Sequence, residues 1–378
     1  MSLSNPPAAN EVEISVLGPG YGECIVAHLA DSDWIIIDSC IDRSSKRPAA
    51  LAYLDRLGVE PANSVKLVMA THWHDDHIRG LADTLRACDD AQFACSDALN
   101  TKEFLTVVNA YARRPMLEGG SGAQEFRSII GVLEERAHRH PAMSHSPKWA
   151  SADRLLWRRE REVSVSGADA EFHSLSPSDA SILAARLGLS ALLPVEGTPK
   201  RRVAALSPNH AAVAAWLRVG PHTVLLGSDL EETSNPLAGW SAILTSTTRP
   251  SGNASVFKVA HHGSHNGDHS GIWTNLLCAN PLAVVTPFPR GKKKLPTPSD
   301  ANRICSRTSC AYITASPDAP RSNRPKVVER MMRGAVRSMR PVHGGYGHVR
   351  LRRTLSDEEA SWSVELFGAA MPLSALVA

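Results

Sequence analysis

The chain has 378 residues, of which 43% are hydrophobic and 21% are charged, so we expect a sizeable core in two ordinary domains or one large α/β domain. A formal net charge of +3 is too small to indicate nucleic-acid binding by itself. No apolar stretch is long enough to span a bilayer, and the first residues do not resemble a signal peptide. Seven scattered cysteines without a CxxC motif are typical of reduced thiols, so we expect a cytoplasmic protein that binds no membrane.

The N-terminal part is predicted to form short strands and two helices. Residues 11–17 alternate polar and apolar side chains, and the strands that follow are short runs rich in Ile and Val. Apolar residues recur on one face of residues 45–57, which predicts a helix that ends at Gly58. The remaining predicted elements of this part are strands at 24–29, 34–37 and 65–70 and a helix at 78–88.

The middle of the chain changes in character. Residues 97–168 have helical periodicity, so we expect a helical insertion that forms a subdomain or a lid. Strands are predicted again near Glu171 and at 211–219, 222–226, 255–260, 282–286 and 363–367, with helices at 180–187, 236–244, 271–278 and 299–307. Two sheets packed together with helices outside would satisfy this order, which places the chain in the α/β class.

Basic residues are concentrated toward the C-terminus. Residues 321–353 contain ten Lys or Arg against one acid, Glu329, and we treat residues 316–378 as a basic C-terminal extension. A shorter basic run consists of Arg290, Lys292, Lys293 and Lys294. These segments form either a docking surface for a phosphate-bearing substrate or only a solvated face.

The strongest chemical signal follows the strand at 65–70, where three histidines and two carboxylates occur within six residues. Burying these groups without partners would cost several kcal/mol, so ordinary core packing does not explain them. Alternate residues at a strand end point the same way, so His72 and His74 can reach one metal ion. Asp76 and His77, past the bend, can turn toward a second ion. Imidazole and carboxylate are the ligands expected for zinc, manganese or iron.

The pattern His72-x-His74-x-Asp76-His77 resembles the HxHxDH signature of the metallo-β-lactamase superfamily. Other elements of that family follow in order: Asp38 after an apolar strand, Asp229 as the aspartate that bridges two metals, and the run 258–264 as the last histidine motif. The resemblance covers roughly residues 11–315. It implies a four-layer αββα sandwich, in which Asp38 accepts a hydrogen bond from a ligating imidazole and fixes its tautomer.

A more specific resemblance is to the ComEC-like hydrolase domain attached to bacterial DNA-uptake channels, and to its stand-alone soluble relatives. Three features carry it: Asn209 before a strand, the run Leu-Leu-Gly-Ser-Asp at 225–229, and His-His-Gly-Ser at 261–264. The Ser-Leu-Ser-Pro-Ser run at 174–178 is also typical of that group.

The resemblance implies that two divalent metal ions are bound, with zinc expected first and manganese as the alternative. Their expected ligands are His72, His74, Asp76, His77, His210, Asp229 and His262. Two positions stay open. The family's third metal motif lies before the strand that leads to Asp229, and either His210 or Asn209 fills it here. The last ligand is His262 or, as the alternative, His261.

The expected mechanism is hydrolysis by a hydroxide held between two ions about 3.5–4 Å apart. Asp76 or Asp229 would orient the water or accept its proton, and His261 would protonate the leaving oxygen. The expected substrate contacts are Ser264, Asn266, Lys292, Lys293 and Lys294.

Three functions are compatible with these residues. A phosphodiesterase or nuclease acting on nucleic acid or a nucleotide is favoured, although aromatic residues are only 5%, which leaves few stacking platforms for single strands. The second is hydrolysis of a small-molecule ester, lactone, thioester or amide, which a largely apolar pocket without cationic lining would indicate. The third is a non-catalytic, metal-bound component of a larger complex, and a protein partner or homo-oligomer is compatible with all three.

Overall fold

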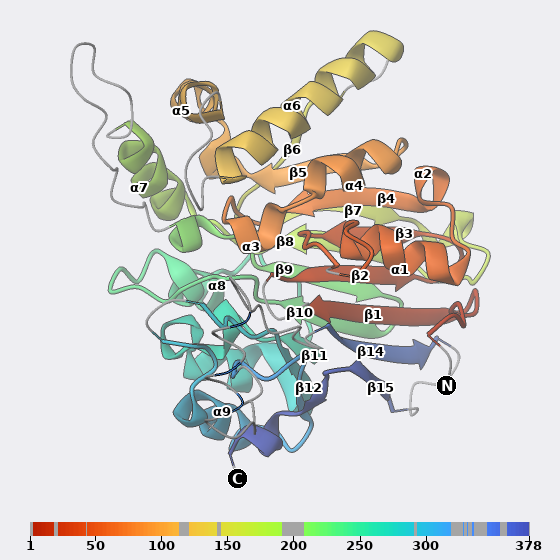
Figure 1. The fold of residues 1–378 in the computed structure, drawn as a ribbon, viewed down its shortest axis with the longest axis vertical. Helices are drawn as coiled ribbons and strands as arrows, with labels where there is room; N and C mark the ends of the chain where they lie inside the picture. The colour runs from red at the N-terminus through yellow and green to blue at the C-terminus, as the bar shows by residue number, and fades with distance from the viewer. Residues whose placement is uncertain are drawn as a thin grey trace.

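The computed structural model describes residues 3–18, 22–42, 44–112, 121–141, 145–190, 208–290, 293–318, 346–355 and 361–377, with positions 328, 331 and 335. Its strands form two mixed sheets of eight strands each, and helices lie on the outer face of both sheets (Figure 1). The four-layer αββα sandwich expected from the sequence is therefore confirmed. No helix in the described ranges has the length and hydropathy needed to span a bilayer.

The first sheet contains most of the N-terminal strands. Its order is β15 (Ser363–Gly368), β14 (Gly347–Thr354), β1 (Glu11–Gly18), β2 (Cys24–Leu29), β3 (Trp34–Ile37), β4 (Val65–Ala70), β5 (Gln92–Ser96) and β6 (Lys148–Ala150). The pairs from β3 to β6 are parallel and the pairs from β15 to β3 are antiparallel. The carboxyl ends of β3 and β4 therefore meet at one edge of this sheet.

The second sheet has the same mixture of directions. Its order is β16 (Met371–Pro372), β13 (Ala311–Ile313), β12 (Leu277–Val285), β11 (Ala254–Lys258), β10 (His222–Leu226), β9 (Ala215–Val219), β8 (Ala170–Ser174) and β7 (Arg154–Arg159). The pairs from β10 to β13 are parallel, and the other pairs are antiparallel. The carboxyl ends of β10 and β11 consequently lie side by side.

Three apolar clusters hold the layers together. One lies between the sheets and combines side chains such as Ile35 of β3 with Val224 of β10, both almost completely buried. Because β3 is buried on both faces, its sequence Trp-Ile-Ile-Ile is continuously apolar and does not alternate. The other two clusters lie between each sheet and its helices.

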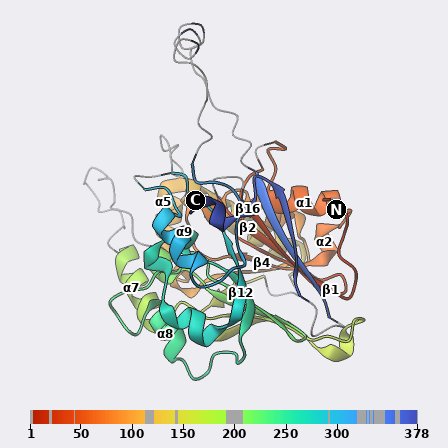
Figure 2. The same cartoon turned by 90° about the horizontal axis from the view of Figure 1, so that it is seen from below.

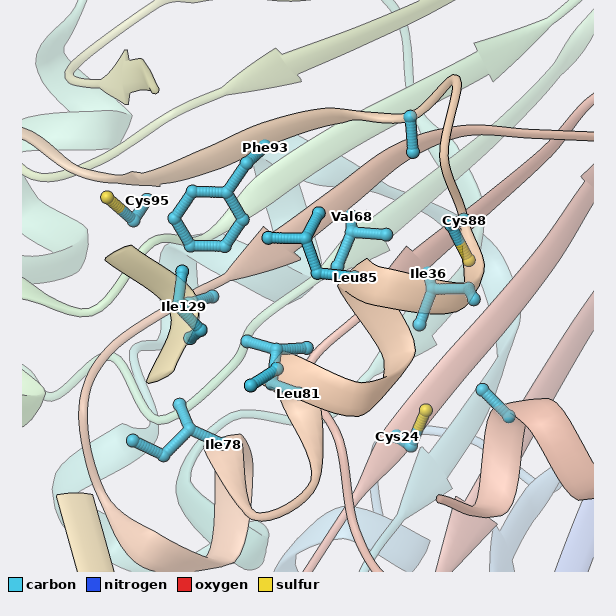
Figure 3. Packing of buried hydrophobic residues seen from close by; sticks show 14 of the residues in the cluster. Cys24, Ile36, Val68, Ile78, Leu81, Leu85, Cys88, Phe93, Cys95 and Ile129 are labelled. Carbon is cyan, nitrogen blue, oxygen red and sulfur yellow. The ribbon is translucent and has the colours of Figure 1, made fainter. Parts of the chain in front are cut away.

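The helices divide between the two outer faces. Those packed on the first sheet include α1 (Ala49–Leu57), α4 (Leu81–Ala87), α5 (Lys102–Ala112) and α6 (Ser121–Arg139), and those on the second include α8 (Gly239–Thr245) and α9 (Pro298–Cys305). Figure 2 shows α8 on the opposite side of the molecule from α1 and from α2 (Pro61–Ser64). In Figure 3, Leu85 of α4 lies against Val68 of β4 and close to Phe93 of β5.

The domain division expected from the sequence stays a prediction, but the strands inside it are placed. Residues 97–168 contain η1 (Asp97–Leu99), α5 and α6, and also β6 and β7, which are the edge strands of the two sheets. Residues 316–378 contain β14, which pairs with β1 along its whole length from Glu11↔Thr354 to Gly18↔Gly347.

Two of the ten C-terminal basic residues do not form a docking surface. Arg350 is buried and donates to Glu365 at 2.6 Å, and Arg352 is buried and donates to Glu13 at 2.8 Å. Both guanidinium groups therefore stabilise the first sheet. Arg321, Arg324, Lys326, Arg330, Arg333, Arg337 and Arg340 lie outside the described residues.

Candidate metal centre

The candidate centre lies where strands of both sheets end. His72 to His77 follow β4, and Asp38 follows the neighbouring parallel strand β3. Asp229 follows β10, and His262 follows the parallel strand β11. Ligand sites in open α/β sheets form at the carboxyl ends of parallel strands, because loops from several strands converge there. Residues far apart in the sequence are therefore brought together at this edge.

Four buried side chains form what we call the His77–His262 group: Asp76, His77, Asp229 and His262. Nε2 of His262 lies 3.3 Å from Oδ2 of Asp229 and 3.4 Å from Oδ2 of Asp76. Nε2 of His77 lies 3.4 Å from Oδ1 of Asp229 and 3.9 Å from Oδ2 of Asp76. Two imidazoles and two carboxylates thus converge on one point.

Three side chains form the His72–His74 group: His72, His74 and Asp229, which both groups share. Nε2 of His72 lies 3.2 Å from Nδ1 of His74, and Nδ1 of His72 lies 3.0 Å from the hydroxyl of Thr71. His74 is half-buried, whereas the other two members are buried. The alternation after β4 expected from the sequence does bring His72 and His74 together.

Both groups fit divalent metal ions. Ligand atoms about 2.0–2.1 Å from a tetrahedral ion are about 3.3 Å from one another, which matches most of the separations between these nitrogens and oxygens. Nε2 of His77, Nε2 of His262 and Oδ1 of Asp229 are also buried without a hydrogen-bond partner among the residues that the structure describes. Buried polar atoms without partners are costly, so their convergence indicates that an ion completes the site. Sharing Asp229 would place the two ions next to each other.

The electrostatics of the two groups differ. Burial lowers the pKa of His262, but the carboxylates of Asp229 and Asp76 outweigh burial and raise it to about 10. Burial also opposes protonation of His77, yet Asp229, Glu23 and Asp38 raise its pKa well above the ordinary value. For His72 and His74 burial dominates, so the pKa of each is lowered. His262 and His77 in turn hold the pKa of Asp229 well below its ordinary value, against the effect of its burial.

Asp38 orients His77, as the sequence predicts. Its Oδ2 lies 2.7 Å from Nδ1 of His77, and its two oxygens accept hydrogen bonds of 2.8 Å from the amide and the hydroxyl of Thr71. The carboxylate therefore keeps the proton of a neutral His77 on Nδ1 and leaves Nε2 free to bind a metal ion. The predicted hydrogen bond is confirmed.

The loops that carry the centre have unusual backbone geometry. Asp38, Ser228, His261 and His262 all have positive φ, between 45° and 59°. Positive φ in a residue other than glycine costs about 1–3 kcal/mol and persists only where surrounding contacts enforce it. The four residues flank or form the candidate centre, so the fold stores strain there to aim these side chains.

A buried ion pair below the His77–His262 group was missed by the sequence analysis. Lys258 and Glu23 are each 1% exposed, and Nζ of Lys258 lies 2.8 Å from Oε2 of Glu23. The hydroxyl of Thr286 donates to the same oxygen at 2.5 Å, and the carbonyl oxygen of Thr286 lies 3.1 Å from Nδ1 of His262. The position of Lys258 at the end of an apolar strand is the only signal the sequence carries.

The third metal motif does not enter either ligand group. The side chain of His210 is 48% exposed, and its Nε2 lies 3.4 Å from Oε2 of Glu231. Asn209 is buried, donates to Oε1 of Glu231 at 2.9 Å, and places its amide nitrogen 3.2 Å from Nε2 of His261. Glu231, which the sequence analysis did not identify, therefore holds the residues expected to complete the first site.

The residues expected to act on the substrate are only partly brought together. Nδ1 of His261 lies 2.9 Å from Oδ1 of Asn266, and the same oxygen accepts a hydrogen bond of 2.5 Å from Ser264. Lys294 is exposed and pairs with Asp318 at 2.9 Å, and Lys293 is also exposed. Lys292 lies outside the described residues.

A cavity of about 150 Å³ adjoins the His72–His74 group. His72, Trp73 and His210 form part of its wall, together with residues of η1 and of α7 (Asp179–Ser190). The candidate centre is thus open on the side of this group.

Comparisons with known proteins agree with this architecture. A family model described as the metallo-beta-lactamase superfamily matches residues 17–270, about two thirds of the chain. Comparison with curated protein sequences gives no match.

Several solved structures are similar to the chain. The metallo-beta-lactamase SMB-1, bound to 2-mercaptoethanesulfonate, is 12% identical over 69% of this chain and 82% of its own, with a TM-score of 0.33. BJP-1, a subclass B3 metallo-beta-lactamase of Bradyrhizobium japonicum, is 13% identical over 68% and 78%, with a TM-score of 0.32. Zn(2+)-bound PqqB from Methylobacterium extorquens is 11% identical over 64% and 71%, with a TM-score of 0.31.

Proposed function

Because the chain belongs to the metallo-beta-lactamase superfamily, we propose that it is a metal-dependent hydrolase that binds two divalent ions. The observation that carries the proposal is the pair of ligand groups that share Asp229. We propose zinc as the metal, with manganese as the alternative, because two imidazoles and at least one carboxylate in each group suit both ions.

The bound ions would act as Lewis acids that increase the acidity of a water molecule and neutralise charge in the transition state. Asp76 and Asp229 have depressed pKa values despite their burial, so they stay ionised and can accept a hydrogen bond from the attacking water. His261 is our proposed general acid. Asn266 and Glu231 lie 2.9 Å and 3.3 Å from its Nδ1 and hold the ring at the rim of the centre.

We propose a phosphodiester as the first candidate substrate. The resemblance of residues 209–264 to the ComEC-like hydrolase domain supports this choice, as does the basic run at 290–294. Substituting Lys292, Lys293 and Lys294 by Ala should raise KM for a phosphorylated substrate. An unchanged KM would remove these lysines from the substrate site.

A second candidate is favoured by the cavity next to His72. Its described lining contains no Lys or Arg and is mostly apolar, which suits an ester, a lactone or a thioester better than a phosphodiester. The two candidates share the same metal centre and differ only in the bond that is cleaved.

The test combines metal analysis with hydrolysis. Metal content is measured on purified protein, and hydrolysis of bis-p-nitrophenyl phosphate, labelled single-stranded DNA and a p-nitrophenyl ester is followed with added zinc or manganese. His74→Ala is the control for all assays. Phosphodiester cleavage that disappears in His74→Ala supports the first candidate, and ester cleavage alone supports the second. Metal binding without hydrolysis of any substrate would contradict an enzymatic function and favour a metal-bound component of a larger complex.

A further inference from the structure

The cavity beside the His72–His74 group is built from four separate segments, one of which is η3 (Pro208–Ala211) with His210 and Ala211. Ala98 and Leu99 come from η1, Ala185 and Leu189 come from α7, and His72 and Trp73 come from the loop after β4. Since His72 belongs both to the cavity wall and to a ligand group, anything held in the cavity lies directly beside the candidate metal centre.

Away from His72, Trp73 and His210, the wall of the cavity is suited to an uncharged occupant. Leu99 and Leu189 are buried and the alanines add only methyl groups, so the described surface is mainly apolar. The one hydroxyl, that of Ser96, already donates to the carbonyl oxygen of Ala211 at 2.9 Å. A phosphate or carboxylate placed against Leu99, Leu189 and the alanines would lose its hydration without gaining an ionic partner from that part of the wall.

The size of the cavity limits the occupant further. An apolar cavity of about 150 Å³ is large enough for a benzene molecule. A short alkyl chain of about four to six carbons fills a similar volume. Ala184 is exposed and the side chain of His210 is 48% exposed, so the cavity is reached from solvent and is not a closed packing defect.

We propose that this cavity is the subsite that receives an uncharged apolar group of the substrate, such as a phenyl ring or a short alkyl chain. The inference rests on the second candidate of the proposed function, hydrolysis of an ester, lactone or thioester, and narrows it, because the bond to be cleaved would lie at the metal centre while the apolar group fills the cavity. The substrate class that fits is an ester, lactone or thioester of a short apolar acid.

The first test is a chain-length series. For p-nitrophenyl esters of straight-chain acids, kcat/KM should rise about fourfold for each added methylene, the equivalent of about 0.8 kcal/mol per buried CH₂. The rise should stop at about six carbons, when the cavity is full. A value of kcat/KM that does not change with chain length would overturn the proposal.

Cavity filling provides a matched pair of variants. Ala185→Leu places a larger side chain in the cavity, whereas Ala180→Leu makes the same change at another half-buried alanine of α7 that does not line it. Ala185→Leu should lower kcat/KM for the hexanoate ester at least tenfold and leave the acetate ester within twofold. Equal effects of the two variants on both esters would contradict the assigned subsite.

A binding measurement separates this proposal from the proposed function. Trp73 lines the cavity, so neutral benzyl alcohol should change its fluorescence saturably, and Trp73→Phe identifies the signal among the eight tryptophans. The change should persist in folded Ala180→Leu and disappear in folded Ala185→Leu. If that result is obtained while no ester or phosphodiester is hydrolysed, the cavity binds an uncharged apolar group but the proposed hydrolase function is wrong. Hydrolysis without any saturable change in Trp73 fluorescence would contradict the assignment of the cavity as a subsite and leave the hydrolase function supported.

Discussion

The two ligand groups share Asp229 but are held by the chain in different ways. All four members of the His77–His262 group are buried, and Asp38 and the carbonyl oxygen of Thr286 fix its two imidazoles. The His72–His74 group has three members, one of them half-buried, and adjoins an apolar cavity. The His77–His262 group is therefore shaped by buried charges packed against it, whereas the His72–His74 group is open toward the cavity.

The largest expected effect comes from the charges beneath the His77–His262 group. Glu23→Gln leaves Lys258 buried without a compensating charge, so we expect the free energy of unfolding to fall by about 3–5 kcal/mol. Denaturant unfolding measures the change.

The matched control for this variant is Glu134→Gln, an exposed position on α6, which should change stability by less than about 0.5 kcal/mol. The double variant Glu23→Gln with Lys258→Met should recover part of the loss, because it removes both charges. If Glu23→Gln lowers the free energy of unfolding by less than about 1 kcal/mol, the buried pair of Glu23 and Lys258 does not stabilise this part of the fold.

The next largest effect is a difference between the two ligand groups in how their metal affinity depends on pH. In metal-free protein His262, whose pKa is raised to about 10, and His77 carry protons at neutral pH, whereas the lowered pKa values of His72 and His74 keep them neutral. Metal must displace two protons from the first pair, so affinity there should rise with pH by about 100-fold per pH unit as long as both imidazoles are protonated. Affinity at the other group should change little.

Calorimetry in buffers with different ionisation enthalpies counts the released protons. His262→Ala, in which only the neutral His72–His74 group should keep its ion, should reduce the count from two to none. Metal binding to the natural sequence without proton release would contradict the assignment. The raised pKa of His262 also makes the free energy of unfolding of metal-free protein depend on pH. Its stabilising contribution is complete below the pKa of the unfolded state, about 6.5. That stabilisation is lost as pH rises through about 10.

A smaller effect is expected from the carboxylate that orients His77. Asp38→Asn keeps the size of the side chain but removes the charge that fixes the Nδ1 proton, so metal affinity should fall about 10–100-fold. Competition with a chromogenic chelator measures this affinity. Asp42→Asn, a buried aspartate that accepts only from Ser44 and Ser45 among the described contacts, serves as the control. Equal affinities for the two variants would argue against a role for Asp38.

The smallest effect is expected at the third metal motif. His210 is directed at Glu231 and not at the His72–His74 group, so His210→Ala should leave the metal content per chain unchanged. Metal analysis beside His74→Ala checks this directly. Loss of one metal ion per chain in His210→Ala would show instead that His210 is a ligand.

Much of the fold was predictable because its signals are local. The polar cluster after an apolar strand, the helix that stops at Gly58 and the two-sheet order all follow from spacing along the chain. The strand predicted at 211–219 begins only at Ala215, because residues 208–211 form the turn η3 beneath the candidate centre. The position of β14 between β15 and β1 was not predictable from its basic sequence, since the acids that pair with Arg350 and Arg352 come from other strands.

The candidate site was predictable only in part, because some of its contacts join residues that are far apart in the sequence. Histidines and aspartates at strand ends are readable as ligands, but the partners of a buried charge are set by tertiary contacts. Glu23 and Lys258 are 235 positions apart and meet only in the folded chain. Glu231, which draws His210 away from the ligand groups, likewise carries no signal of its own in the sequence.

The central claim is that two ligand groups sharing Asp229 bind two metal ions in this chain. It is tested most directly by counting zinc and manganese per folded chain, after saturation and removal of free metal, in the natural sequence, in His74→Ala and in His262→Ala. We expect two ions in the natural sequence and one in each variant, with proton-linked binding retained only in His74→Ala. No bound metal in a folded chain, or two ions retained in either variant, would contradict it.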